Sequence, residues 1–130
     1  MKTRAQGPIA VSGEDLVYQY FKCIESKDLD GILELFDYDA TVKEPFSNVP
    51  GGLRGRSSIE PFLKVAMMAN SKLQRKIKLE KPIPGKTDSN KVVAIVTFEK
   101  GDKVKGRFSF EFENTPEGRK KIKSLKIEFL

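Results

Sequence analysis

The residues best suited to chemistry lie in one short stretch, 39–46, where a glutamate directly precedes a proline. Val42 and Glu44 are two residues apart, so their side chains point to the same face if the chain is extended there. If Val42 faces a core, Glu44 is carried inward with it, and apolar surroundings would raise its pKa toward the range that a general base needs. Glu44 is therefore the first candidate catalytic residue. The alternative is a structural acid paired with Arg54, Lys43 or another cation at the rim.

The sequence contains no histidine and a single cysteine, Cys23. The lack of histidine removes imidazole bases, Ser-His-Asp triads and almost every zinc site, so acid–base chemistry would have to come from Asp, Glu, Tyr or Lys. One cysteine excludes an intrachain disulfide. We therefore expect a protein that works without a metal or a cofactor.

Composition indicates an ordinary globular chain of 130 residues, 38% hydrophobic and 32% charged, which is typical of one domain. No apolar run approaches the roughly 18 residues needed to span a bilayer, and no apolar segment follows the basic N-terminus as in a signal peptide. We expect a flexible arm over 1–11, a single domain over 12–130 and a cytoplasmic location without membrane contact.

Three helices are predicted in the first half of the chain. Ser12 begins one that runs to about Ser26, with Asp15 completing a capping box. A second extends from near Asp28 to Phe36. A third is capped by Ser57, with apolar residues at helical spacing up to about residue 70.

Strand periodicity dominates the second half. Arg75, Ile77 and Leu79 alternate with charged residues, and the run 92–98 is apolar on both faces, which predicts a central, doubly covered strand. Residues 104–112 then alternate strictly, with Phe108, Phe110 and Phe112 on one face. A break of parity at Ile122 in the last strand predicts a bulge near Ser124. Helices followed by antiparallel strands favour an α+β class: three N-terminal helices packed on a strongly curved, mainly antiparallel sheet, forming a cone-shaped barrel with an apolar cavity.

The stretch 39–46, followed by Gly55-Arg56-Ser57-Ser58-Ile59 and Phe62, resembles the nuclear transport factor 2-like superfamily in its SnoaL-like and ketosteroid isomerase-like branch. The resemblance covers roughly residues 12–130 and implies the cystatin-like fold of that superfamily. In ketosteroid isomerase the acid before proline is the general base, and a tyrosine and a protonated aspartic acid hold the enolate oxygen. The resemblance therefore implies Glu44 as base and Tyr20 as oxyanion donor. The third position falls on Phe108, which cannot donate a hydrogen bond.

Other side chains are candidates for contact with a ligand. Arg54 on the glycine-rich loop would hold an anionic group, although a loop arginine is more often solvated. The expected apolar lining is Phe46, Phe62, Met67, Phe108 and Phe110. Apolar and aromatic residues at such regular spacing usually form only the core. Tyr20 is likewise equally well explained as a core tyrosine.

Two functions follow. The first is a small-molecule pocket protein that binds an apolar carbonyl compound, with Glu44 and Tyr20 performing proton transfer such as isomerisation or cyclisation. The second is a non-catalytic domain for ligand binding, protein interaction or homodimerisation, since Val93, Ile95 and Thr97 need a cover on the outer sheet face. A net charge of +6, concentrated in residues 72–130, raises nucleic-acid binding as a third interpretation, but no aromatic residues are interleaved with the basic cluster near residues 119–126, which argues against it.

Overall fold

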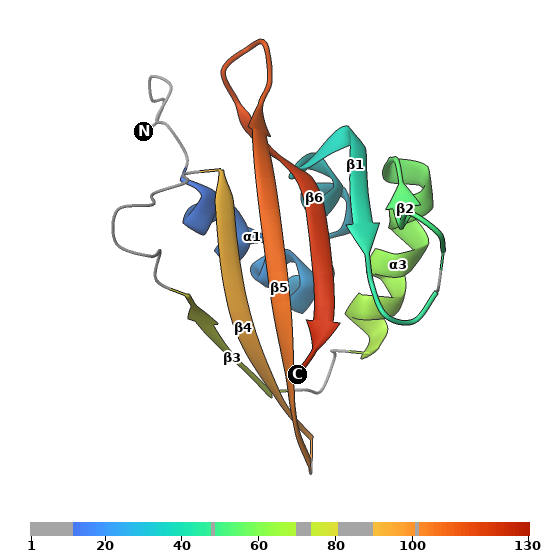
Figure 1. Cartoon of the computed structure of the whole chain (residues 1–130), viewed down its shortest axis with the longest axis vertical. Coiled ribbons are helices and arrows are strands. Elements are labelled where there is room, and N and C mark those ends of the chain that lie inside the picture. Colours follow the sequence, from blue (N-terminus) through green and yellow to red (C-terminus); the bar gives the residue numbers. More distant parts are fainter. Residues whose placement is uncertain (1–11, 48, 70–73, 81–89, 101) are drawn as a thin grey trace.

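The computed structural model describes residues 12–47, 49–69, 74–80, 90–100 and 102–130 (Figure 1). The predicted arm over 1–11 lies outside these residues. The predicted α+β class is confirmed, with three helices and six strands in the described chain. In order they are α1 (Gly13–Ser26), α2 (Leu29–Glu34), β1 (Phe36–Lys43), β2 (Leu53–Arg54), α3 (Arg56–Ala69), β3 (Gln74–Leu79), β4 (Lys91–Lys100), β5 (Asp102–Asn114) and β6 (Lys120–Phe129).

The first helix begins as its sequence predicts. The Ser12 hydroxyl accepts the Asp15 N–H at 3.1 Å and the Asp15 carboxylate accepts the Ser12 N–H at 3.4 Å, a capping box that satisfies otherwise free backbone donors. Lys27 ends the helix in the left-handed conformation, and Asp28 caps α2 by accepting the Gly31 N–H at 2.9 Å. The α2 helix is shorter than predicted, because Phe36 opens β1 instead of closing the helix.

The third helix begins one residue before its predicted cap. The helix includes Arg56, and the Gly55 carbonyl accepts the Ile59 N–H at 3.0 Å. Gly55 has a φ of 86°, a conformation open to glycine that turns the chain directly from β2 into α3. The prediction of Ser57 as the cap is therefore wrong.

The six strands form one mixed sheet in the order β2-β1-β6-β5-β4-β3. Only the pair β1 and β6 is parallel, so the prediction of a mainly antiparallel sheet is confirmed among the described strands. The β4 strand lies between β5 and the edge strand β3, not at the centre. Its outward residues Val93, Ile95 and Thr97 are only half-buried, so the predicted double cover is absent within the described chain. The strong curvature stays a prediction.

The predicted bulge lies where β6 meets β5. Glu111 pairs with Ser124 and the next residue, Phe112, pairs with Ile122, so Lys123 is passed over. One extra residue restores the parity, and Ile122 and Leu125 are both buried. The bulge prediction is confirmed.

Helices cover one face of this sheet. Figure 1 looks onto the opposite face, and α1 and α2 lie behind the strands. The core is built between these layers from apolar stripes of the helices and the inward face of the strands, including Phe108, Phe110 and Phe112. This is the face that the alternation of β5 predicts. The region between α1 and the sheet is therefore the apolar interior of the protein, where a polar side chain would need a binding partner.

Candidate functional site

Glu44 lies just beyond the end of β1, in a turn. Val42 is fully buried, as predicted, but the strand ends at Lys43 and Glu44 is only half-buried. Its carboxylate folds over the next residues: Oε2 accepts the Phe46 N–H and Oε1 accepts the Ser47 N–H, both at 2.9 Å. The prediction that Glu44 points into the core with Val42 is wrong.

These contacts also reverse the expected electrostatics. Partial burial raises the pKa of Glu44, but hydrogen bonds from the Ser47 side chain and from the backbone N–H groups of Phe46 and Ser47 outweigh it and lower the pKa overall. In the described chain no ion pair joins Glu44 to Arg54, Lys43 or another cation, so the cation partner of the structural-acid alternative is absent there, and the carboxylate binds backbone N–H groups instead. Glu44 is thus an ionised carboxylate at neutral pH whose oxygens are engaged by its own turn.

A shallow pocket of about 340 Å³ opens beside this turn. Its glycines bring the backbone close: Gly52 has a φ of 88°, and a Cβ there would lie 2.7 Å from the Val42 carbonyl oxygen. The predicted ligand residues Phe46 and Arg54 are exposed and do not line the pocket, whose walls are Lys43, Glu44, Ser47, Val49, Gly51 and Gly52.

Tyr20 lies elsewhere, in the aromatic interior under α1. Its side chain is 2% exposed, and its ring meets the edges of Phe21 and Phe110 at centroid distances of 5.0 and 5.4 Å. No described residue forms a hydrogen bond with its hydroxyl. Burial raises the pKa of Tyr20 far above its ordinary value, a shift that the positive charge of Arg75 opposes. The hydroxyl is therefore a neutral group, and the described residues use neither its donor nor its acceptor capacity.

Most of the remaining predicted ligand residues share this interior. Met67, Phe108 and Phe110 are buried and Phe62 is half-buried. Phe108 lies edge-on to Phe21 at 5.3 Å, so it extends the same aromatic cluster as Tyr20. The structure thus places Tyr20 in the same core as the predicted apolar lining residues. Glu44 instead lies in a turn beside a separate surface pocket.

Arg75 is a charged residue with a largely covered side chain, and the sequence alone does not identify it as a site residue. Its side chain is 9% exposed and lies on the inward face of β3, opposite Phe98 of β4. Nη2 donates to the Phe21 carbonyl at 3.3 Å and lies 3.4 Å from a carboxylate oxygen of Glu25. The signal was present in the sequence, because Arg75 shares the parity of Ile77 and Leu79.

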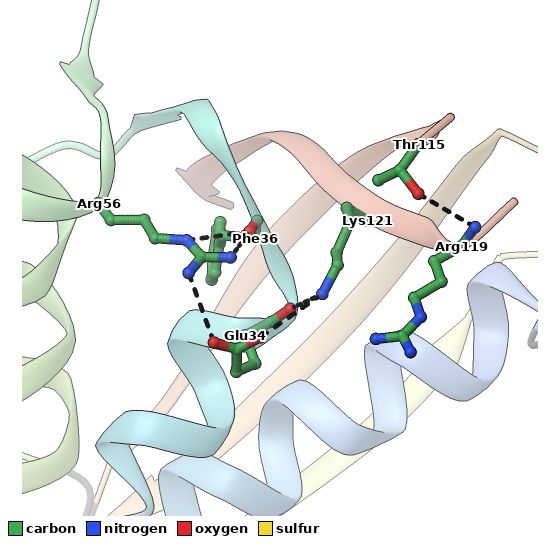
Figure 2. A network of polar contacts seen from close by, with 6 residues as sticks. All are labelled: Glu34, Phe36, Arg56, Thr115, Arg119 and Lys121. Carbon is green, nitrogen blue, oxygen red and sulfur yellow. Dashed lines mark hydrogen bonds and ion pairs between the residues drawn. The ribbon is translucent and has the colours of Figure 1, made fainter. Parts of the chain in front are cut away.

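A second arginine, Arg56, fixes the start of β1 (Figure 2). Its Nη2 and Nε donate to the Phe36 carbonyl at 2.7 and 3.2 Å, and Nη1 lies 3.5 Å from the Glu34 carboxylate. Lys121 of β6 reaches the carbonyl and the carboxylate of the same Glu34. The network joins the end of α2, the start of α3 and two strands, and it is a structural clamp at the beginning of the strand that ends before Glu44.

Within the described residues there is no cluster of three or more His, Cys, Asp or Glu side chains that could hold a metal ion. The helices seen in that part of the chain are too short or too polar to cross a membrane.

No protein-family model and no curated protein matches the sequence, but many solved structures share its fold. A putative calcium/calmodulin-dependent protein kinase type II association domain from Thiobacillus denitrificans is 12% identical, with a TM-score of 0.71 over 95% of this chain and 99% of that one. A SnoaL-like protein of unknown function from Burkholderia thailandensis is 15% identical, with a TM-score of 0.66 over 90% and 93%. A computationally designed 17-OHP binder is 15% identical, with a TM-score of 0.64 over 94% and 95%.

Further similar structures are described as NTF2-like or as having a cystatin-like fold. The fold implied by the resemblance of the sequence is therefore confirmed. At these identities the similarity establishes architecture and leaves activity to the residues of the site.

Proposed function

We propose that this protein binds a small, mostly apolar molecule carrying a carbonyl group, in the aromatic interior between α1 and the sheet. The observation that carries the proposal is the hydroxyl of Tyr20, a residue that is only 2% exposed, because the described residues provide this hydroxyl with no hydrogen-bond partner. A buried polar group left unpaired costs about 1–3 kcal/mol. A ligand oxygen that accepts a hydrogen bond from Tyr20 would remove that cost.

The surroundings of Tyr20 favour such a ligand. Phe21, Phe36 and Phe110 lie edge-on to its ring, so the immediate neighbours of the Tyr20 ring are aromatic. Binding sites for small molecules are typically apolar with few polar groups that fix orientation. A designed 17-OHP binder has the same fold, which supports small-molecule binding as something this architecture can do.

Binding of a cyclic ketone and of the hydrocarbon with the same ring skeleton would test the proposal. We expect the ketone to bind about tenfold more tightly than the hydrocarbon, the difference made by one buried hydrogen bond. Tyr20→Phe should abolish the difference, whereas Tyr38→Phe, at a tyrosine that is 75% exposed, should leave it intact. Equal affinity of Tyr20→Phe and the unchanged protein for the ketone would refute the role of Tyr20.

Proton transfer by Glu44 is the catalytic extension of this proposal. Its lowered pKa keeps the carboxylate ionised at neutral pH, as a base must be, but two N–H donors already occupy its oxygens. Catalysis would therefore require the turn to release Glu44. If a ketone is found to be isomerised, Glu44→Gln should reduce turnover by several orders of magnitude, and unchanged turnover would remove Glu44 as the base.

Self-association through the outer face of the sheet is a second candidate, favoured by the half-buried Val93 and Ile95 of β4, which no described element covers. A structure with the same fold is described as a putative association domain. In the register of the sheet, Ile95 lies between Lys78 and Arg107. A symmetric dimer would bring these cations near their copies, so association should strengthen as salt screens the repulsion.

Sedimentation velocity at micromolar concentration and two salt concentrations tests this candidate. We expect a dimer that is favoured by salt and abolished by Ile95→Asp, while Ile77→Val on the inward face leaves it intact. A monomer at both salt concentrations would exclude the outer face as a dimer interface.

A further inference from the structure

Arg75 is a largely covered cation, and the described residues use little of its hydrogen-bonding capacity. A guanidinium carries five N–H donors in a planar fork. In the described part of the chain, Nη2 makes both polar contacts of Arg75, to the Phe21 carbonyl and to Glu25, and Nε and Nη1 contact no acceptor. The side chain is nevertheless only 9% exposed.

Glu25 is a weak counter-ion for this cation. Its side chain is 80% exposed, and the single approach to Arg75 is 3.4 Å, longer than a charge-assisted hydrogen bond of good geometry. Solvent screens an exposed carboxylate, so it compensates little of the cost of burying a charge. The charge of Arg75 is therefore poorly neutralised by the described residues.

Arg56 shows what a purely structural arginine looks like in this fold. All three of its guanidinium nitrogens are engaged, two by the Phe36 carbonyl and one by Glu34 (Figure 2). Arg75 could likewise be explained as a clamp between β3 and α1, because Nη2 reaches the Phe21 carbonyl. That explanation accounts for one nitrogen, whereas the other two nitrogens of this largely covered cation meet no acceptor among the described residues.

The residues next to Arg75 are apolar and incompletely covered. Ile77 and Leu79 share its face of β3, and Phe98 lies opposite it on β4; all three are half-buried. The Phe21 ring, part of the Tyr20 cluster, lies 5.8 Å from the guanidinium carbon. A partly covered apolar surface with an unsatisfied cation at one end fits a molecule with an apolar body and an anionic head.

We infer that the small molecule proposed above is a carboxylic acid, and that Arg75 binds its carboxylate while the Phe21 and Phe98 rings contact its apolar body. This inference rests on the proposed function and adds the chemical class of the ligand. A carboxylate matches the guanidinium fork because two parallel N–H groups meet its two oxygens. It also supplies negative charge to a cation whose described counter-ion, Glu25, is 80% exposed. The Phe21 ring is a common neighbour of both polar groups, 5.0 Å from the Tyr20 ring and 5.8 Å from the Arg75 guanidinium carbon.

The test uses two aromatic probes of nearly equal shape, naphthalene-2-carboxylate and naphthalene-2-methanol, measured by isothermal titration calorimetry at neutral pH. We expect the unchanged protein to bind the acid about ten- to a hundredfold more tightly, as for a charge-assisted hydrogen-bond pair. Arg75→Met should reduce the affinity for the acid to that for the alcohol and leave the alcohol unaffected. Lys76→Gln is the matched control, because it removes the same charge from the exposed, outward side of the adjacent position.

Arg75→Lys is a second variant, in case Arg75→Met does not fold. It keeps the positive charge but lacks the paired N–H donors of the guanidinium. The acid should then raise the melting temperature of the unchanged protein and of Lys76→Gln by several degrees more than that of Arg75→Lys. Equal binding of both probes, or an acid preference that survives in Arg75→Met or in full in Arg75→Lys, would overturn the inference while leaving the proposed function standing. Binding of neither probe would count against both.

Discussion

Val42 and Glu44 are two residues apart, yet only Val42 faces the core, while Glu44 closes a turn by accepting two backbone N–H groups. Pro45 explains the difference. Proline has no N–H to continue a strand ladder and restricts the residue before it, so β1 ends at Lys43. The backbone N–H groups of Phe46 and Ser47 then have no strand partner, and they donate to the carboxylate of Glu44 instead.

Glu44→Gln should destabilise the protein at neutral pH by about 1 kcal/mol, comparable to the loss of a helix cap, because an amide has only one acceptor oxygen for two N–H donors. The pKa of Glu44 is lowered in the folded protein. Its contribution is therefore complete above the ordinary glutamate pKa of about 4.3 and is lost as pH falls through the lower folded value. Urea unfolding between pH 3 and 7 should show the two proteins converging at the acid end.

Glu60→Gln provides the comparison for that measurement. Glu60 pairs with Lys64 at 3.1 Å on the exposed side of α3, a contact worth about 0.3–0.5 kcal/mol. A loss from Glu44→Gln no larger than this would show that the turn does not depend on the carboxylate.

Tyr20 should make the protein sensitive to alkali. Its pKa is raised by burial, so the unfolded chain ionises first, near pH 10, and folded stability falls as pH rises above that value. The loss approaches about 1.4 kcal/mol per pH unit for one such group. Tyr20→Phe should lack this component of the pH dependence. It should also be at least as stable as the unchanged protein at pH 7, because it removes a buried hydroxyl with which no described residue pairs. Urea unfolding at pH 7, 10 and 11 measures both effects, and an identical pH dependence of the two proteins would mean that the pKa of Tyr20 is not raised in the folded protein and that its hydroxyl is solvated.

The elements that periodicity specifies strongly were predictable from the sequence. Ser12 and Asp15 predict the first helix start, and the alternation through Phe108, Phe110 and Phe112 predicts the inward face of β5, because both signals are local. The parity break that places the bulge near Ser124 is local too.

The site was less predictable because its geometry depends on where elements end and meet. The same parity rule that correctly buries Val42 misplaces Glu44, since β1 stops one residue earlier. Arg75 was visible as a charged residue at an inward position of its strand. Its incomplete pairing depends on Phe21 and Glu25 of α1, about fifty residues away in the chain, and no local pattern contains that information.

Arg56→Lys should cost about 2 kcal/mol of stability, because a lysine cannot reproduce the fork that reaches the Phe36 carbonyl and Glu34 together. The stacking of the guanidinium 4.1 Å above the Tyr38 ring would be weakened as well. Arg54→Lys, at an exposed position two residues earlier, should change stability by less than about 0.5 kcal/mol. Chemical denaturation of the unchanged protein, Arg56→Lys and Arg54→Lys measures these differences in stability. Equal losses for the two variants would contradict the assignment of Arg56 as a clamp.

Phe46 allows ligand contact to be separated from stability. It is 72% exposed, and its main aromatic partner in the described chain is Phe129, edge-on at 5.4 Å. Phe46→Ala should therefore cost no more than about 1 kcal/mol, the value of an exposed aromatic pair, whereas Phe110→Ala in the core should cost about 3–5 kcal/mol. A several-fold loss of ketone affinity in the stable Phe46→Ala protein would then report a lost contact, as the sequence predicts for this residue. Unchanged affinity would confine the ligand to the interior around Tyr20, because no loss of folding could mask the result.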